Sequence, residues 1–312
     1  MMFPGQGSQS VGMLSTLAAA EPVVAETFAD ASSVLGYDLW QLCQQGPEEQ
    51  LSATERTQPA MLAAGVAVWR AWTRRGGQAP AMMAGHSLGE YSALVCAGAI
   101  NFGAAVALVR LRGQAMQRAV PAGTGAMAAI LGLDDAAIEA ACTESAQGAV
   151  VQPVNYNSPG QLVIAGNAAA VARVIENCKA RGAKRAVLLP VSVPSHSKLM
   201  KPAAEEMRAR LSDLDVQAPA IRVYAFDGGL HDTPAAIRDG LYRQLFNPVR
   251  WSAIVAAMIA AGAGQLIECG PGKVLAGLAR RAPGGRDLAI NAIDGADSLR
   301  AALTAATGSD NR

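Results

Sequence analysis

The stretch MMAGHSLGEYSALVCAG, residues 82–98, joins a short apolar run to a run of helical composition through a corner that holds one serine. Residues 81–85 are few and apolar enough for a buried strand, and residues 90–100 have the composition of a helix. Between them, Ser87 follows Gly85 by two positions and precedes Gly89 by two, which is the G-x-S-x-G pattern. The pattern predicts an α/β protein in which a strained strand-to-helix turn exposes the hydroxyl of Ser87.

Length and composition limit the remaining possibilities. The chain of 312 residues is long enough for one large domain with an insertion or for two domains. A hydrophobic fraction of 51% with 16% charged residues is typical of a globular α/β enzyme. The formal net charge of +1 gives no overall field that would attract nucleic acid or an anionic membrane.

The cysteines and the apolar runs indicate a cytoplasmic protein. The five cysteines are widely spaced and form neither a CxxC pair nor a zinc-binding pattern, so we expect reduced thiols and no metal site. The most membrane-like run, residues 60–69, is about half as long as a bilayer crossing requires. The N-terminal residues show no signal peptide, and we expect neither a membrane nor a nucleic-acid partner.

The order of elements predicts an inserted subdomain. Residues 57–75 have the features of a capped helix that begins near Thr57 and Pro59. Further along, the chain reads as strand 126–133, helix 134–146, strands 149–157 and 161–166, helix 168–182 and strand 183–193. This βαββαβ order predicts a ferredoxin-like small subdomain over residues 123–193, with residues 1–122 and 194–312 forming the catalytic core. We expect about the last twenty-five residues to form a frayed tail.

A serine nucleophile needs a base, and the chain holds three histidines, His86, His196 and His231. His86 adjoins Ser87, and neighbours at a tight turn diverge, so it is a poor base. His231 lies in the turn-like segment DGGLHDTP, where we expect a solvated loop histidine. His196 lies where an apolar strand ends and a helix begins, so its ring can reach across a cleft, and we favour it as the base. No acid stands out as a third triad member, and a backbone carbonyl is the alternative partner of the imidazole.

Two arginines on one predicted helix are candidates for binding an anion. Arg110 and Arg112 are two residues apart and therefore face different directions on the helix. If one of them points into the protein, its guanidinium needs a partner, and a carboxylate fits it in a bidentate manner. That partner is either a substrate carboxylate or a protein acid in an internal salt bridge, and the sequence pattern leaves both open.

Seven motifs in a fixed order make the chain similar to a known family. They are FPGQGSQSVGM, GHSLGEYSALVCAG, RLRGQAMQ, NYNSPGQLVIAG, VSVPSHSKLM, QLFNPVRW and ECGPGKVL, and they extend from Phe3 to about Arg281. This series resembles that of the malonyl-CoA:acyl carrier protein transacylases of bacterial fatty acid synthesis. The resemblance implies an α/β-hydrolase-like core with a parallel sheet, a ferredoxin-like insertion, and no cofactor besides the coenzyme A and phosphopantetheine that carry the substrate.

The resemblance also implies a role for each candidate residue. Ser87 would attack the malonyl thioester, with His196 as base and the carbonyl of Gln244 orienting the imidazole. The predicted position of Leu88 at a helix start agrees with an oxyanion-binding N–H. The further implied roles are the N–H groups of Gln6 and Leu88 in the oxyanion hole, Arg112 as partner of the malonyl carboxylate, and Asn157 and Gln161 along the thioester and pantetheine channel.

The implied partners are malonyl-CoA and an acidic acyl carrier protein, and we expect a monomer. Acetyl-CoA lacks the carboxylate and would leave Arg112 unpaired, whereas methylmalonyl-CoA differs by one methyl group only, so its exclusion stays open. The basic residues Lys184 and Arg185 of the predicted subdomain are candidates for steering the carrier protein, although an ordinary solvated face explains them equally.

Three other functions stay open. A serine esterase or thioesterase would use the same turn with water as acceptor, but it does not need Arg112. A catalytically silent subunit that only binds a carrier protein does not need Ser87 and His196 intact. A malonyl transferase that serves malonate decarboxylase or a polyketide assembly line fits the same residues. The segment VYAFDGGLHDTP, residues 223–234, departs from the asparagine-containing strand end of the family.

Overall fold

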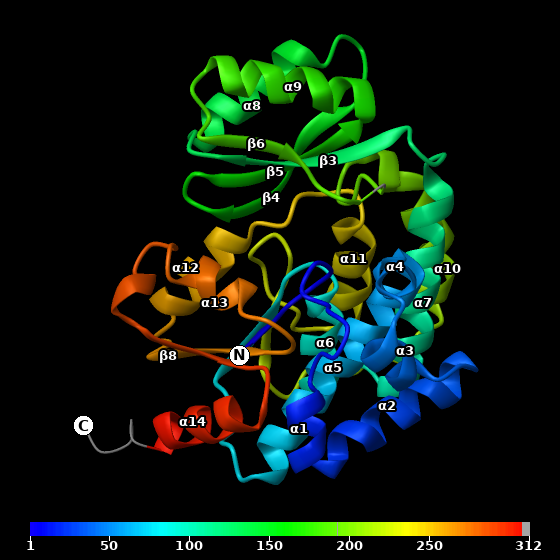
Figure 1. Cartoon of the computed structure of the whole chain (residues 1–312), viewed down its shortest axis with the longest axis vertical. Coiled ribbons are helices and arrows are strands. Elements are labelled where there is room, and N and C mark those ends of the chain that lie inside the picture. Colours follow the sequence, from blue (N-terminus) through cyan, green and yellow to red (C-terminus); the bar gives the residue numbers. More distant parts are fainter. Residues whose placement is uncertain (192, 308–312) are drawn as a thin grey trace.

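A five-stranded parallel sheet lies at the centre of the larger part of the molecule (Figure 1). The computed structural model describes residues 1–191 and 193–307. In spatial order the strands are β7 (Arg222–Tyr224), β2 (Met82–Gly85), β1 (Met2–Phe3), β8 (Gln265–Cys269) and β9 (Ala289–Ile293). A short, wholly apolar strand such as β2 is typical of a parallel sheet that is buried on both faces.

Helices cover both faces of this sheet because successive side chains of each strand point to opposite sides. Phe3 and Met83 pack into one cluster with α2, α5, α6 and α7, whereas Met2 and Met82 pack into another with α12 and α13. The helices of this part are α1 (Ser15–Ala20), α2 (Pro22–Leu35), α3 (Leu39–Gln45), α4 (Glu48–Ser52), α5 (Thr54–Arg74), α6 (Gly89–Cys96), α7 (Phe102–Ala119), α10 (Lys201–Ser212), α11 (Pro234–Gln244), α12 (Trp251–Ala260), α13 (Val274–Ala279) and α14 (Ala296–Thr307), with short 3-10 turns at Lys198–Met200 and Gly285–Asp287.

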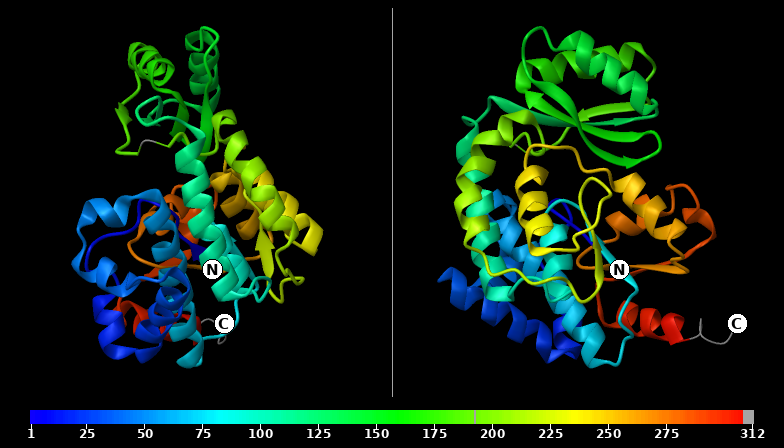
Figure 2. Two further views of the ribbon diagram at one scale, coloured as in Figure 1. Left: turned by 90° about the vertical axis from the view of Figure 1, so that its right-hand side faces the viewer. Right: turned by 180° about the vertical axis from the view of Figure 1, so that it is seen from behind.

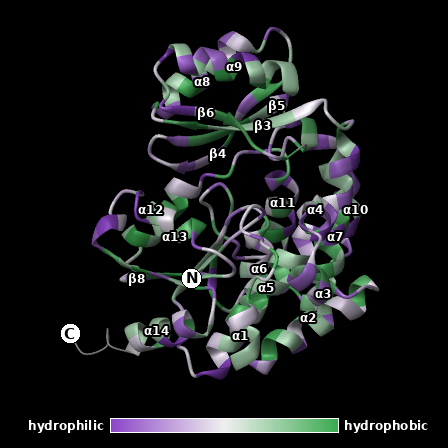
Figure 3. Ribbon diagram, viewed as in Figure 1, coloured by the Kyte–Doolittle hydropathy of each residue, from purple (hydrophilic) through white to green (hydrophobic). Residues whose placement is uncertain are grey.

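The outer helices are amphipathic. Hydrophilic and hydrophobic residues alternate along α8 (Asp135–Ser145), α9 (Ala168–Ala180) and α10, which lie at the surface of the molecule (Figure 3). None of the helices within residues 1–191 and 193–307 combines the length and the apolar character that a bilayer crossing requires.

The predicted start of α5 is wrong. The helix begins at Thr54, and the hydroxyl of Thr57, which is shared between the carbonyls of Leu51 and Ala53, does not cap it. Pro59 therefore lies inside α5, near its N-terminal end.

The prediction of a frayed tail is also wrong for the residues that the structure describes. β9 pairs in parallel with β8, and α14 buries Leu299 and Ala302. The polar residues of this stretch obscured two apolar patterns, AINAI for the strand and LRAAL for the helix. Residues 308–312 lie outside the described residues.

A four-stranded antiparallel sheet forms the smaller part. Its order is β4-β5-β3-β6, built from β3 (Gly125–Leu131), β4 (Val151–Ser158), β5 (Gln161–Asn167) and β6 (Arg185–Leu188). Two helices, α8 (Asp135–Ser145) and α9 (Ala168–Ala180), cover one face (Figure 1). The fold is therefore an α/β-hydrolase-like core with a ferredoxin-like insertion, as predicted, whereas the boundaries at residues 123 and 193 stay a prediction.

The uncovered face of the small sheet looks toward the core, as two further views show (Figure 2). Met127, Val154 and Val163 form an apolar cluster on this face. The segment before α12 is joined to β4 by hydrogen bonds from Tyr156 N to Val249 O (2.9 Å) and from Val249 N to Val154 O (2.8 Å). This pairing holds the small sheet above the turn between β2 and α6.

Candidate active site

The turn between β2 and α6 has the predicted strained geometry. Ser87 has a φ of 53°, in the left-handed region that few residues other than glycine adopt. A Cβ on Gly85 would lie 1.9 Å from the carbonyl carbon of Gly89, and one on Gly89 would lie 1.9 Å from the carbonyl oxygen of Phe3. Both glycines are needed because backbone fills the space where their side chains would be.

Ser87 and His196 lie within hydrogen-bond distance. The distance from Ser87 Oγ to His196 Nε2 is 2.6 Å, and that from His196 Nδ1 to the carbonyl oxygen of Gln244 is 2.7 Å. A carbonyl only accepts, so Nδ1 carries the hydrogen and Nε2 is left to accept the proton of the serine. This arrangement is that of a nucleophile with its base, in which a backbone carbonyl replaces the acid of a triad.

The surroundings of His196 favour its neutral form. Burial, and in second place the positive charge of Arg112, lower the pKa of His196 from 6.5 to about 3. The imidazole is therefore available as a base throughout the neutral pH range.

Arg112 is a buried cation beside the nucleophile, with 1% of its surface exposed. Its Nη1 donates to Gln58 Oε1 (2.9 Å), and its Nη2 donates to Gln244 Oε1 (2.9 Å) and lies 3.4 Å from Ser87 Oγ. Within the described part of the chain, Arg112 forms no ion pair and its Nε has no hydrogen-bond partner. Arg110 faces elsewhere and donates to Leu35 O (2.9 Å). The internal salt bridge that the sequence left open for Arg112 is therefore absent from the described residues.

A cavity of about 120 Å³ adjoins these groups. Its walls come from both parts of the molecule, with Gln6, His86, Ser87, Leu88, Arg112, Met116, Val193, Ser195 and His196 on the core side and Met127, Asn155, Val163, Leu189 and Val191 on the side of the small sheet. Among the described residues, no hydrogen bond uses the amide N–H of Gln6 or of Leu88. Both amides are thus free to donate to an oxyanion.

His86 lines the same cavity, but its hydrogen-bond partner is on the small sheet. Its Nε2 lies 2.9 Å from Asn157 Oδ1, and its ring centroid lies 5.5 Å from that of Trp251. Burial lowers the pKa of His86. The side chain therefore packs beneath the small sheet and is bonded to β4.

The structure does not bring every predicted residue to this cavity. Gln161 accepts a hydrogen bond from Arg281 Nη2 (2.8 Å) in a separate cleft of about 620 Å³, which Lys184 also lines. Lys184 and Arg185 are exposed. Neither Asn157 nor Gln161 lines the cavity at Ser87, and their part in binding a pantetheine arm remains a prediction. Asn155, which does line it, was missed because the motif NYNSPGQ offers two asparagines two residues apart on one strand, and the alternation of strand faces does not distinguish between them.

The prediction of a solvated His231 is wrong. The residue is 2% exposed, and its Nε2 lies 2.6 Å from Glu90 Oε1. The hydrogen bond from His231 N to Val223 O (2.9 Å) folds the turn back onto β7 and carries the side chain inward. Sequence reasoning also missed Glu90. A charged residue in the otherwise apolar run EYSALVCAGAI was the available signal.

No group of three or more histidine, cysteine or acidic side chains with the spacing of a metal site occurs among residues 1–191 and 193–307. The groups that face the cavity are the hydroxyl of Ser87, the imidazole of His196, the free amides of Gln6 and Leu88 and the guanidinium of Arg112.

The class of protein follows from sequence comparison. The family model described as acyl transferase domain matches residues 1–284. The malonyl CoA-acyl carrier protein transacylase of Salmonella typhimurium is 58% identical over 304 residues, which cover 97% of this chain and 98% of that protein. The protein of the same name from Escherichia coli is 60% identical over 281 residues, which cover 90% of this chain and 91% of that one.

Solved structures agree with this class over the whole length. The acyl carrier protein S-malonyltransferase of Vibrio cholerae has a TM-score of 0.94 at 58% identity and covers 96% of this chain and 98% of its own. The malonyl-transacylase solved in complex with a type II PKS acyl-carrier protein has a TM-score of 0.96 at 56% identity, over 98% of both chains. The chain belongs to the malonyl CoA-acyl carrier protein transacylase family.

Proposed function

We propose that this protein transfers the malonyl group from malonyl-CoA to the phosphopantetheine thiol of an acyl carrier protein, and so supplies fatty acid synthesis. The observation that carries the proposal is the position of Arg112. An unpaired guanidinium, buried within 3.4 Å of a nucleophilic serine, is suited to a thioester whose acyl group ends in a carboxylate. A plain esterase has no use for such a cation.

In the first half-reaction, Ser87 Oγ attacks the thioester carbonyl while His196 Nε2 takes its proton. The N–H groups of Gln6 and Leu88 donate to the oxyanion of the tetrahedral intermediate. The C–S bond then breaks, and the imidazolium returns the proton to the departing thiolate of coenzyme A. The carbonyl of Gln244 holds the Nδ1–H of His196 through both proton transfers. A malonyl ester on Ser87 remains.

In the second half-reaction, the carrier protein's thiol enters the same cavity. His196 takes the thiol proton, the sulfur attacks the ester carbonyl, and the C–O bond to Ser87 breaks as the serine oxygen regains the proton. The order is ping-pong, because coenzyme A must leave before the second thiol can approach. No metal or further cofactor takes part.

Lys184 and Arg185 are proposed to steer the acidic carrier protein toward the cavity at Ser87. Both are exposed on the small sheet, and Lys184 lines the cleft that also holds Arg281. We further propose that the protein acts as a cytoplasmic monomer.

Intact-mass spectrometry tests the proposal. The protein is mixed with malonyl-CoA, and holo acyl carrier protein is added afterwards, with Ser87→Ala alongside. The expected result is a malonyl adduct that is absent from the variant and moves to the carrier. An adduct lost to water at the same rate without carrier would make the protein a thioesterase. No adduct on the folded protein would indicate a silent, carrier-binding subunit.

A second candidate is malonyl transfer to the carrier protein of a polyketide assembly line. The observation that favours it is the 56% identity to a malonyl-transacylase solved with a type II PKS acyl-carrier protein. Malonate decarboxylase is the remaining alternative. Discharge of the malonyl-enzyme onto fatty acid, polyketide and decarboxylase carriers in parallel distinguishes the three by their rates.

A further inference from the structure

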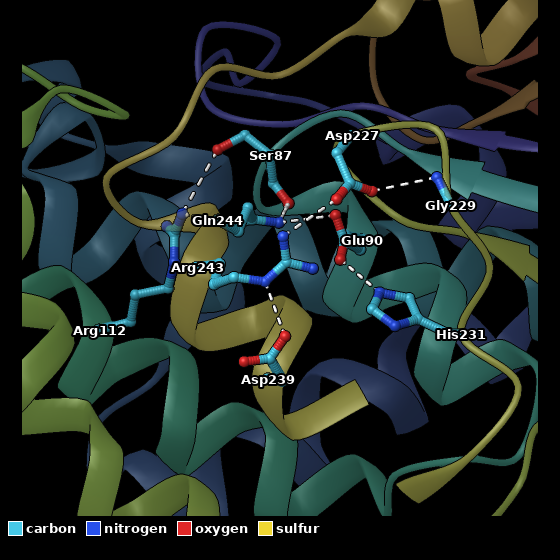
Figure 4. Close-up of polar contacts among 9 residues, drawn as sticks. All are labelled: Ser87, Glu90, Arg112, Asp227, Gly229, His231, Asp239, Arg243 and Gln244. Carbon is cyan, nitrogen blue, oxygen red and sulfur yellow. Dashed lines mark hydrogen bonds and ion pairs between the residues drawn. The ribbon is translucent and has the colours of Figure 1, made fainter. Parts of the chain in front are cut away.

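Arg112 and a buried carboxylate lie close together without forming an ion pair. The carboxylate is that of Glu90, on the first turn of α6, and it is 0% exposed. The side-chain amide of Gln244 lies between the two charges (Figure 4). Its Oε1 accepts from Arg112 Nη2 at 2.9 Å, and its Nε2 donates to Glu90 Oε2 at 2.9 Å.

This amide has only one orientation that satisfies both neighbours. A guanidinium only donates hydrogen bonds and an ionised carboxylate only accepts them, so the oxygen of Gln244 must face Arg112 and its nitrogen must face Glu90. The same nitrogen donates to the carbonyl oxygen of Ser87 at 3.0 Å. The charge of Glu90 therefore fixes the orientation of the Gln244 amide, which is hydrogen-bonded to both Arg112 and the backbone of Ser87.

His231 holds the other oxygen of Glu90. The distance from His231 Nε2 to Glu90 Oε1 is 2.6 Å, and both side chains are buried. Each oxygen of this carboxylate thus has its own donor. A buried carboxylate that loses a donor must find another, because leaving it unpaired is costly.

The position of His231 is built into the fold around it. A hydrogen bond from Ala225 N to Gly229 O (2.9 Å) closes the turn that precedes it. In that turn, Asp227 Oδ2 forms an ion pair with Arg243 Nη1 of α11 at 3.3 Å. On α11, Gly240 faces the imidazole, and a Cβ there would lie 2.5 Å from His231 Cε1. A glycine inside a helix lowers its stability, so its presence here has a packing reason.

We propose that His231 and Glu90 are a positioning pair that determines the specificity for a malonyl group. His231 holds Glu90 one amide away from Arg112, so the guanidinium is left without an acidic partner and is free to bind the carboxylate of the substrate. The inference rests on the proposed function and adds to it the group that keeps the site selective.

The proposal predicts that removal of the His231 imidazole changes the preference for malonyl over acetyl. Glu90 Oε1 then has no donor, while the charges of Glu90 and Arg112 attract each other and the Nε–H of Arg112 has no hydrogen-bond partner. A carboxylate that turns toward Arg112 competes with the malonyl carboxylate and does not affect a neutral acetyl group in the same way. The preference for malonyl over acetyl falls, mainly through the KM for malonyl-CoA.

The experiment measures the second-order rate constants for acylation of Ser87 by malonyl-CoA and by acetyl-CoA. In His231→Ala and in Gly240→Ala, which displaces the ring without changing any charge, the malonyl-to-acetyl ratio falls by between about tenfold and a hundredfold. His231→Gln, whose amide keeps a donor for Glu90, retains the wild-type ratio. The matched control is Glu206→Gln, which removes a carboxylate on the exposed face of α10 and leaves the ratio unchanged.

Two results would overturn the inference. One is an unchanged ratio in both His231→Ala and Gly240→Ala with native circular dichroism. The other is an equal loss of both rates, which would make the pair a purely structural support. If His231→Ala does not fold, Gly240→Ala decides. Failure of the proposed function is recognised separately, because then the wild-type protein itself forms no malonyl adduct.

Discussion

The charge of Arg112 is the residue-level feature that separates this site from that of a plain hydrolase. Burial lowers the pKa of its guanidinium, and its protein partners are neutral amides. If Arg112 binds the malonyl carboxylate as proposed, Arg112→Ala leaves that carboxylate without a partner in a desolvated site, which costs about 3–5 kcal/mol. We expect kcat/KM for malonyl-CoA to fall by roughly three orders of magnitude, with a much smaller change for acetyl-CoA.

Steady-state kinetics with both thioesters checks this expectation. Arg110→Ala is the matched control, because Arg110 lies on the same helix but donates to Leu35 O, and its kinetics should stay close to wild type. Equal losses for malonyl-CoA and acetyl-CoA in Arg112→Ala would contradict the carboxylate-binding role.

His196 leads to a prediction about pH. In the proposed mechanism its neutral form is the base, and a pKa lowered from 6.5 to about 3 keeps the imidazole neutral far below the usual pH range. The rate of Ser87 acylation should therefore stay level between about pH 5 and 7, where an unperturbed histidine would lose most of its activity. Rapid-quench measurement of the malonyl adduct across this range provides the test. An inflection near pH 6.5 would show that burial and Arg112 do not depress the base.

At the scale of elements, the strand–turn–helix unit of β2 and α6 depends on close contact between the backbone at Gly85 and the backbone at Gly89. In Gly85→Ala, the new Cβ meets the backbone of Gly89 at 1.9 Å, so the turn must open. We expect the free energy of unfolding to fall by about 3 kcal/mol or more. Gly277→Ala is the control, because no atom lies within 4 Å of its Cβ position in α13, and helix propensity raises stability by up to about 1 kcal/mol. Urea unfolding of both variants measures the difference, and equal midpoints would be inconsistent with the contact.

Local elements could be predicted from the sequence because their signals are local. The G-x-S-x-G turn and the βαββαβ order follow from glycine spacing and from changes in apolar period within short windows. The start of α5 and the elements β9 and α14 were missed, since polar residues interrupt their patterns. Glu90 and Gln244 are 154 residues apart, and no local pattern predicts a pairing over such a separation. His231 looked solvated for the same reason, because its partner lies on another element.

At the scale of the whole molecule, the site exists only where the two sheets meet. Ser87, His196 and Arg112 belong to the core, whereas Met127 and Asn155 close the cavity from the small sheet. The pairing of Val249 with β4 fixes the distance between these walls. In the proposed function, the thioester arm enters between the two sheets, and we expect the carrier protein to dock where it can reach both of them.

This geometry makes the outer rim of the small sheet the place to test docking. In the double variant Lys184→Glu and Arg185→Glu, two positive charges become negative near the cleft that Arg281 lines. We expect the KM for an acidic carrier protein to rise by about tenfold at low ionic strength, and the effect to shrink at high salt because exposed charges are screened. The rate at which malonyl-CoA acylates Ser87 should change little.

The matched control is the double variant Arg74→Glu and Arg75→Glu, which reverses two exposed charges at the carboxyl end of α5. This end of the helix lies at the end of the molecule away from the small sheet (Figure 1). If both double variants raise the KM equally, net charge and not this rim attracts the carrier, and if neither does, Lys184 and Arg185 have no part in docking.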